Sequence, residues 1–210
     1  MSARRRLALA ALLGLLAALA GCASAPWRAA PAPAAADARW AAHRDAVAGL
    51  AAFTVTGRVG IQRGSEGGGA KLRWRQQGPD SDLRIMAPLA QGSFRLQGDA
   101  GQVVLSAPDG KQYRAASFEA LMAAHLGWSF PVEGARYWVR GIPDPRQPVE
   151  QLSLDGEGRL SDLAQAGWRI SVLEYGAAAG TTLPKRLFLN AGDLKIRLAI
   201  DGWELPEGPM

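Results

Sequence analysis

The sequence predicts a mainly β protein in which a few helices interrupt an antiparallel sheet. Two observations support this fold class. Apolar residues alternate with polar or charged ones in about eleven short segments, a pattern that gives each strand one face in the core and one in water. Clusters rich in Gly, Pro and Asp separate the segments at hairpin intervals, because these residues adopt the backbone angles of tight turns. We expect strands that are adjacent in sequence to pair.

The N-terminus has the order of a secretory signal peptide, which we place at residues 1–21. Arg4, Arg5 and Arg6 precede an unbroken apolar run that ends in Leu-Ala-Gly before Cys22, the only cysteine of the chain. With its cysteine directly after Ala-Gly, this segment resembles a bacterial lipobox, which implies acylation of the Cys22 thiol and of the amine freed by cleavage. An uncleaved membrane span is the alternative, but a span needs about 20 apolar residues and this run is shorter.

Ala23 follows the cysteine and bears on the destination of the protein. In Gram-negative lipoproteins, Asp at this position is associated with retention in the inner membrane. The resemblance therefore implies a lipid-anchored protein on the periplasmic face of the outer membrane.

Residues 22–36 combine the cysteine with an Ala/Pro-rich stretch, and a single folded domain is expected over residues 37–206. Ala/Pro-rich segments tend toward extended, polyproline-like structure, so this one predicts a tether. Inert filler with no length requirement is the alternative. Without the signal peptide the chain has 21 basic and 19 acidic residues, a net charge of +2. The basic residues are scattered, so we expect no nucleic-acid binding.

A helix over residues 37–50 opens the folded part. Asp37 can cap it, and Trp40, Val47 and Leu50 recur at roughly helical spacing. Strands with period-two alternation follow it. Their inward positions are Phe53, Val55, Val59, Ile61, Leu72, Trp74, Leu83, Ile85, Phe94 and Leu96, and the loops between and after them lie at residues 64–69, 78–80, 98–101 and 108–110.

Two short helices are expected within residues 117–142. Ser117 caps a segment with apolar side chains from Phe118 to Met122 on one face, and Pro131 starts a second segment with apolar residues at helical spacing. These helices either close the mouth of an open barrel or form the ordinary cap on a hydrophobic core.

Further strands follow the helices. They cover residues 149–154, 159–164, 168–172, 183–190 and 193–203. In the last strand, Ile196 and Leu198 alternate with Lys195 and Arg197, so one face is apolar and the other is charged.

The residues of a catalytic or metal site are sparse. His43 and His125 are the only histidines and fall in different predicted helices. Most aspartates lie in turns, where backbone geometry explains them. Residues 64–69 are no phosphate loop, because they lack the Gly-Lys-Ser/Thr ending and lead into a strand. We therefore expect no enzyme, no cofactor and no metal.

An apolar interior rich in tryptophan is the remaining feature. Its members are Trp40, Trp74, Trp128, Trp138, Trp168 and Trp203. Tryptophan can line an acyl-chain pocket, but ordinary cores use it as well. Composition alone leaves both interpretations open.

Short motifs in a fixed order resemble the LolB family of outer-membrane lipoproteins. They are Gly-Arg-Val-Gly at residues 57–60, Ala-Pro-Leu at 87–89, Tyr-Trp-Val-Arg-Gly-Ile-Pro at 137–143, Leu-Pro-Lys-Arg-Leu at 183–187 and Lys-Ile-Arg-Leu at 195–198. Together with the lipobox and the helix around Trp40, they span nearly the whole chain. Their order and spacing carry the resemblance.

The resemblance implies an unclosed antiparallel β-barrel with a few helices as a lid over a hydrophobic cavity. It also implies a monomer that accepts acylated lipoproteins from the periplasmic carrier LolA and places them in the outer membrane without nucleotide. Burial of an acyl chain contributes roughly 0.8 kcal/mol per CH₂, so the receptor needs an apolar pocket. We expect its lining on the inward faces of the strands, with ordinary core as the alternative for each residue: Leu72, Trp74, Phe94, Leu96, Trp168, Ile170, Val172, Leu187, Leu189, Ile196, Leu198 and Ile200.

Leu89 is the residue expected to act in membrane insertion. It follows Pro88 in a loop between two strands, where an exposed large apolar residue has no folding reason. In the family a loop of this pattern protrudes, and its leucine is implicated in delivery to the bilayer. Ala90 stands where a glycine is usual, so a Leu89 that folds back onto the barrel rim is the alternative.

Two other functions use the same features. One is an assembly lipoprotein of the envelope whose sheet binds protein partners, and the other is a lipid or glycolipid binder that uses the cavity. Uptake of a fatty-acid-like probe argues against the assembly protein, and competition by a lipidated protein favours lipoprotein transport.

Overall fold

The computed structural model describes residues 33–87, 92–99, 101–178 and 180–206. The predicted signal peptide, Cys22 and Leu89 lie outside these residues. In the described part of the chain, no helix combines the length and the apolar character needed to cross a membrane.

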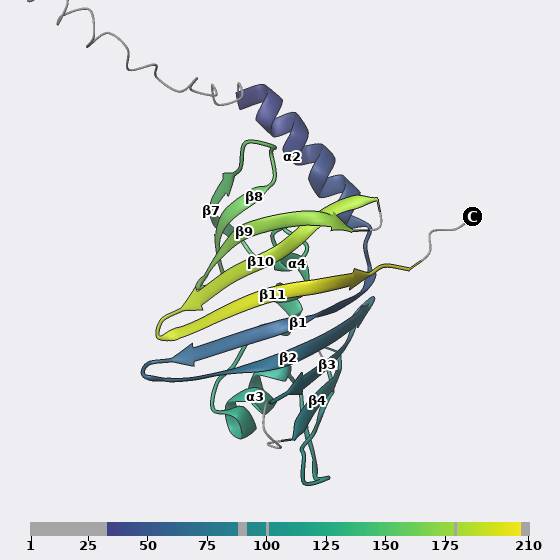
Figure 1. Cartoon of the computed structure of the whole chain (residues 1–210), viewed down its shortest axis with the longest axis vertical. Helices are drawn as coiled ribbons and strands as arrows, with labels where there is room; N and C mark the ends of the chain where they lie inside the picture. The colour runs from purple at the N-terminus through teal and green to yellow at the C-terminus, as the bar shows by residue number, and fades with distance from the viewer. Residues whose placement is uncertain (1–32, 88–91, 100, 179, 207–210) are drawn as a thin grey trace, which may run out of the picture. The chain divides into compact units, whose positions relative to one another are not determined.

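The strands form one antiparallel sheet that curls without closing (Figure 1). Neighbours in sequence pair as predicted, except for β6 and β7, and β1 also pairs with β11, which joins the two halves of the sheet. The edge strands β6 and β7 do not pair with each other, so the predicted unclosed fold is confirmed. The strands are β1 Ala52–Arg63, β2 Glu66–Gln77, β3 Asp80–Met86, β4 Ser93–Gly98, β5 Val103–Ser106, β6 Gln112–Ala115, β7 Val149–Leu154, β8 Leu160–Gln165, β9 Trp168–Ala178, β10 Thr181–Ala191 and β11 Leu194–Glu204.

The first described helix, α2 (Pro33–Ala48), begins four residues before the predicted Asp37. Alanine is the strongest helix former, and proline is tolerated in the first turn. The Ala run at residues 34–36 therefore joins the helix, although the composition of this stretch suggested a tether. Asp37 lies inside the helix rather than at its cap.

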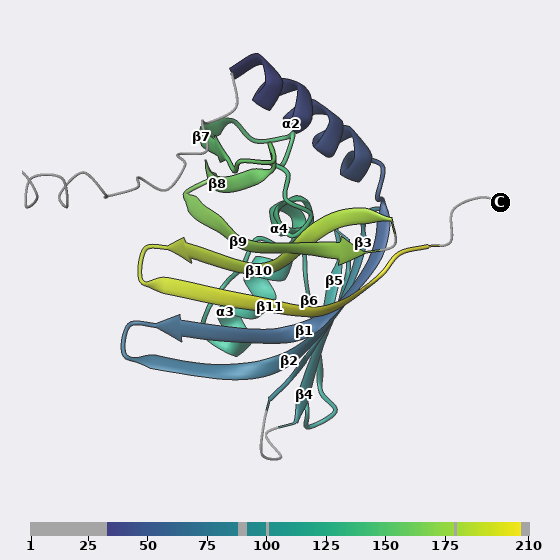
Figure 2. The same ribbon diagram turned by 45° about the horizontal axis from the view of Figure 1, so that its top comes forward.

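The other two described helices connect β6 to β7 across the concave side of the sheet (Figure 2). Helix α3 (Phe118–Leu126) is capped by Ser117, whose hydroxyl accepts a hydrogen bond from the Ala120 N–H at 3.2 Å, as predicted. Helix α4 (Val132–Trp138) follows Pro131, also as predicted, but ends before Ile142.

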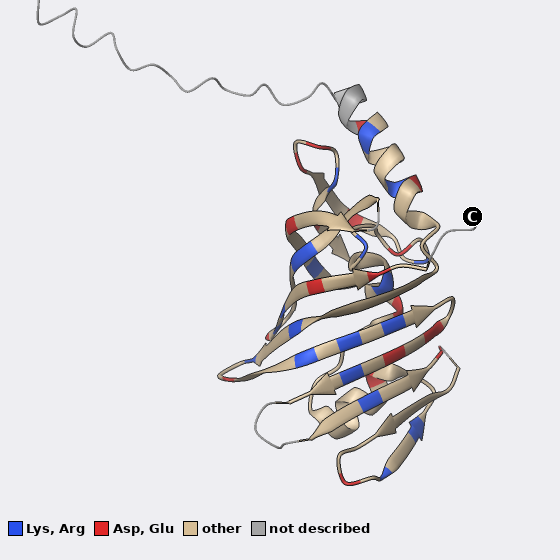
Figure 3. Ribbon diagram, turned by 45° about the vertical axis from the view of Figure 1, so that its right-hand side comes forward, with Lys and Arg blue, Asp and Glu red and all other residues tan. Residues whose placement is uncertain are grey.

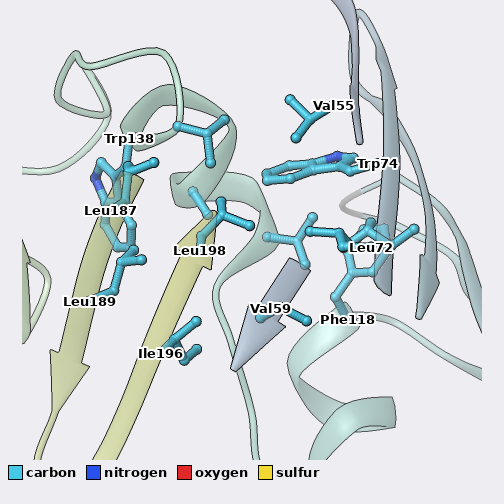
Figure 4. Packing of buried hydrophobic residues seen from close by; sticks show 14 of the residues in the cluster. Val55, Val59, Leu72, Trp74, Phe118, Trp138, Leu187, Leu189, Ile196 and Leu198 are labelled. Atoms are coloured by element: carbon cyan, nitrogen blue, oxygen red, sulfur yellow. The ribbon is translucent and has the colours of Figure 1, made fainter. Parts of the chain in front are cut away.

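The core fills the space between the two halves of the curled sheet. Figure 4 shows Leu72 and Trp74 on one side and Leu187 and Leu189 on the other, with Phe118 of α3 nearby. The helices thus complete a core that the sheet leaves open.

A steric constraint on the backbone explains why the motif at residues 57–60 begins with glycine. Where β1 pairs with β11, the register shifts by one residue between Thr56 and Gly57. A Cβ at Gly57 would lie 2.2 Å from the carbonyl oxygen of Ala199, whereas a Cβ at Gly60 would have its nearest neighbour at 3.9 Å. Only the first glycine is required by the close approach of the two strands.

Replacement of Gly57 by alanine should therefore lower the free energy of unfolding by about 1–3 kcal/mol, the usual effect of overpacking. Gly60→Ala is the matched control and should change it by less than about 1 kcal/mol. Urea denaturation of both variants measures the difference. Equal effects would contradict the assigned steric role of Gly57.

Candidate functional site

An apolar cavity lies between the concave face of the sheet and the helical segment. Side chains of β1, β2, β3, β10 and β11 form its wall, and α3 with the residues up to Val139 covers it. The lining consists of Val59, Leu72, Trp74, Leu83, Ile85, Leu189, Ile196 and Leu198 from the strands and Met122, Trp128, Phe130 and Val139 from the helical segment. All twelve side chains are hydrophobic in character.

The cavity has a volume of about 40 Å³. Pockets that hold a small molecule typically measure about 300–1,000 Å³. The helical segment therefore occupies most of the space that the concave face of the sheet would otherwise offer.

Five of the twelve residues predicted to line the cavity do so in the structure: Leu72, Trp74, Leu189, Ile196 and Leu198. The other seven pack in the same core without lining the cavity: Phe94, Leu96, Trp168, Ile170, Val172, Leu187 and Ile200. Contact of any of them with an acyl chain stays a prediction.

The other seven lining residues were not among those that the sequence predicted for the cavity. Val59, Leu83 and Ile85 continue the alternation that was recognised in their strands, so that signal could have found them. Trp128 and Phe130 lie between α3 and α4 in residues 127–131, which have no helical or strand pattern. Their position depends on how the segment packs against the sheet.

Aromatic contacts hold the cover of the cavity in place. The ring of Phe130 meets that of Trp168 edge-on, with 5.4 Å between centroids. At the far end of α3, the exposed His125 stacks on Tyr113 of β6 with 3.8 Å between centroids. Such pairs contribute about 0.5–1.5 kcal/mol each beyond their buried area, and the buried Phe118, Leu121 and Met122 of α3 add to the packing.

A buried polar network fixes α4 more firmly. The indole N–H of Trp138 donates to Oε1 of Gln165 at 2.8 Å, and Nε2 of Gln165 donates to the carbonyls of Asp144 and Gln147 at 2.9 and 3.0 Å. Burial opposes ionisation of Asp144, but two hydrogen bonds from Arg146 at 2.9 Å hold its pKa below the ordinary value. The buried Gln165 of β8 thus holds the end of α4 and the residues that follow it in place.

Arg140, which belongs to the motif at residues 137–143, has a structural role. Its buried guanidinium donates to the carbonyls of Val47, Ala48 and Leu50 at 3.1, 3.4 and 2.9 Å, at the C-terminal end of α2. Burial lowers the pKa of Arg140. A cation is favourable there because the last carbonyls of a helix carry partial negative charge.

Arg140→Met should therefore lower the free energy of unfolding by about 1.5–3 kcal/mol, since it removes hydrogen bonds from a charged donor. Arg44→Met is the control, because Arg44 is an exposed residue of α2 that pairs with the adjacent Asp45, and exposed pairs contribute about 1 kcal/mol or less. Thermal unfolding of both variants measures the effect. Equal stability of the two would show that Arg140 does not secure α2.

The two histidines occupy separate environments. His43 of α2 lies edge-on to Tyr175, and burial lowers its pKa. Burial also raises the pKa of Tyr175, whose hydroxyl donates to the carbonyl of Leu160 at 2.8 Å. His125 stacks on Tyr113. Among the residues that the structure describes, no three His, Cys, Asp or Glu side chains are grouped to hold a metal ion.

Comparisons with known proteins agree on one family. The model of the family described as "Outer membrane lipoprotein LolB" matches residues 51–203. The chain is 38% identical over 190 residues to the outer-membrane lipoprotein LolB of Pseudomonas putida strain W619, covering 90% of this chain and 92% of that protein. It is 39% identical over 166 residues to LolB of Nitrosococcus oceani, covering 79% and 83%.

Solved structures support the fold independently of sequence. A LolA superfamily protein from Nitrosomonas europaea superposes with a TM-score of 0.54 at 10% identity, covering 83% of this chain and 95% of that one. A DUF1329 family protein from Desulfovibrio piger gives a TM-score of 0.52 at 10% identity, covering 84% and 95%. At this identity the likeness concerns the fold alone.

Proposed function

Because this chain belongs to the LolB family of outer-membrane lipoproteins, we propose that it accepts acylated lipoproteins from the periplasmic carrier LolA and inserts them into the outer membrane. The family is one of lipoprotein transport. In this proposal the protein is a monomer, its substrate is the acylated end of another lipoprotein, and the receiving partner is the lipid of the inner leaflet.

The apolar cavity under a helical cover is the observation that supports this proposal most directly. Each buried CH₂ of an acyl chain contributes roughly 0.8 kcal/mol, so an apolar cavity can take a chain from the carrier without nucleotide if its affinity is higher. Since the closed cavity is only about 40 Å³, acceptance requires α3 and residues 127–131 to move away from the sheet.

The remaining parts place this cavity at the membrane. Residues 1–21 are removed, the acylated Cys22 anchors the protein, and the segment between Cys22 and α2 separates the anchor from the folded domain. Leu89, in the connection between β3 and β4, enters the bilayer during delivery. The anchor thus determines where the protein works, while the cavity and Leu89 carry out the transfer.

Uptake of a fluorescent fatty-acid analogue by the mature protein tests the cavity. Phe130→Asp should reduce uptake by about tenfold or more, because a buried charge is unfavourable against an acyl chain. Leu152→Asp is the control, since Leu152 of β7 is also half-buried but neither lines the cavity nor belongs to the predicted lining. Equal losses would contradict the assignment of the site to the cavity.

Competition distinguishes this function from its alternatives. Lipidated cargo should displace the analogue, while the same cargo without acyl groups should not. Absence of any uptake would favour an assembly protein, and uptake that lipidated cargo does not affect would favour a binder of free lipids.

A further inference from the structure

A second hollow lies on the outer face of the sheet, opposite the cavity. It has a volume of about 740 Å³ and crosses β3, β2, β1, β11, β10 and β9. Gly60 and Gly69 contribute no side chain to it, so the backbone forms part of its floor. We call this hollow the outer groove.

Exposed apolar side chains stand at both ends of the outer groove. Leu173 of β9 is 65% exposed, and Met86 at the end of β3 is 39% exposed. Only one other large hydrophobic residue is comparably exposed in the described part of the chain, Val149 on β7. Between these two residues the groove is lined by Ala70, Ala199 and the half-buried Phe188, so apolar surface continues along it and indicates a contact surface.

The outer groove is also cationic. Its lining contains Arg58, Lys71, Arg186 and Arg197 and, among the described residues, no acidic side chain. Figure 3 shows Lys and Arg recurring along the strands of the sheet, with Asp and Glu on several of them as well. The groove therefore complements an anionic partner.

Two of these cations are engaged in ion pairs, and two are available. Arg58 pairs with Asp201 at 3.3 Å, and Arg186 pairs with Glu174 of β9 at 2.6 Å. Arg197 instead lies over the ring of Phe188, 5.9 Å from its centroid. Within the described residues, Lys71 and Arg197 have no carboxylate within ion-pair distance.

The combination of exposed apolar and basic side chains matches the surface of a membrane. Apolar groups enter the interfacial region of a bilayer, while Lys and Arg pair with anionic headgroups at its surface. The position agrees with this partner, because Met86 ends β3 and the chain continues into the connection that carries Leu89.

We propose that the outer groove docks on anionic phospholipid headgroups of the bilayer, with Leu173 and Met86 in the interfacial region and Lys71 and Arg197 on the phosphates. The proposal rests on the proposed function, which places this protein and its Leu89 at the outer membrane. Docking would hold the domain flat on the bilayer and keep the β3–β4 connection at the lipid surface.

An environment-sensitive thiol probe at Leu173→Cys tests the docking in the full mature chain. The chain has one natural cysteine, Cys22, so the parent protein takes no label if its thiol is acylated. The labelled protein is reconstituted in vesicles of phosphatidylethanolamine with phosphatidylglycerol, or with phosphatidylcholine instead. The same probe at Val149→Cys is the control position, because Val149 is an exposed apolar residue outside the groove.

The expected result is a blue shift in the emission of the probe at position 173. This shift should require phosphatidylglycerol, become smaller as the salt concentration rises and be absent for the probe at position 149. Lys71→Glu with Arg197→Glu should lower the ratio of docked to undocked protein by about tenfold or more. Lys111→Glu with Arg114→Glu introduces the same charge change at β6 and its hairpin, outside the groove, and should retain the shift.

Two results would overturn the proposal. One is an equal shift at both positions, or a shift that stays the same without phosphatidylglycerol and when Lys71 and Arg197 are replaced by glutamate. The other is a shift that appears only when the purified carrier is added, which would assign the groove to a protein partner. Because the readout needs no cargo, a normal docking signal with failed lipoprotein transfer would refute the proposed function alone.

Discussion

Joining α3 to β6 by a short covalent bridge should reduce the affinity for a lipoprotein released by the carrier by about tenfold or more. Affinity falls in proportion to the population of the open state, and the bridge would deplete that state. Tyr113→Cys with His125→Cys provides the two thiols, since their rings stack at 3.8 Å between centroids. A bifunctional maleimide with an internal disulfide forms the bridge, and reduction should restore acceptance.

A bridge within the sheet is the matched control. Val104 and Arg114 are paired neighbours on β5 and β6, so a bridge between cysteines at these positions leaves α3 free. This variant should accept lipoprotein normally, with or without reduction. Normal acceptance by the bridged α3 variant would show that α3 is not the moving part.

Leu89→Glu should leave acceptance nearly unchanged and reduce delivery to vesicles by about tenfold or more. A carboxylate in place of leucine at the centre of a bilayer is less favourable by about 3 kcal/mol. Delivery is measured as cargo that floats with the vesicles, and acceptance as cargo that leaves the carrier.

Gln91→Glu controls for charge in the same stretch of sequence, since it adds a carboxylate without removing the leucine. Delivery by this variant should remain close to that of the parent. Normal delivery by Leu89→Glu would remove the assigned role and favour a leucine that folds back onto the barrel rim.

Local sequence patterns predicted most of the strands. A period-two alternation identifies the inward face wherever a strand has one wet side, as in β11, where Ile196 and Leu198 face the core. The pairing of β1 with β11 has no such local signal, because the two strands lie about 140 residues apart and meet only where the two halves of the sheet join. The start of α2 was misplaced because Ala/Pro-rich composition suggested a tether where an Ala run forms a helix.

From the sequence, only the part of the cavity wall that the sheet forms could be predicted. Alternation located Leu72 and Trp74 on the cavity wall, but it also selected Trp168 and Ile170, which pack beyond the cavity. Which strand residues line the cavity and which lie in the packed core depends on where Phe130 and its neighbours pack against the sheet. That position follows from tertiary packing of a segment without periodicity, so no pattern in the sequence encodes it.

The motifs of the resemblance carry structural roles that the sequence did not reveal. Gly57 allows the close approach of β1 and β11, and Arg140 secures the C-terminal end of α2. Both residues shape the frame around the cavity rather than its lining. A motif can thus identify a family through residues that build its scaffold.

Transfer of a lipidated protein from purified LolA to this protein is the most direct test of the account. The mature protein in vesicles and the loaded carrier are mixed without nucleotide, and the location of the cargo is followed over time. We predict that cargo leaves the carrier, crosslinks transiently to a photoreactive group at Phe130, and then appears in the vesicles. Cargo that stays on the carrier, or that reaches the vesicles equally well without this protein, would contradict the account.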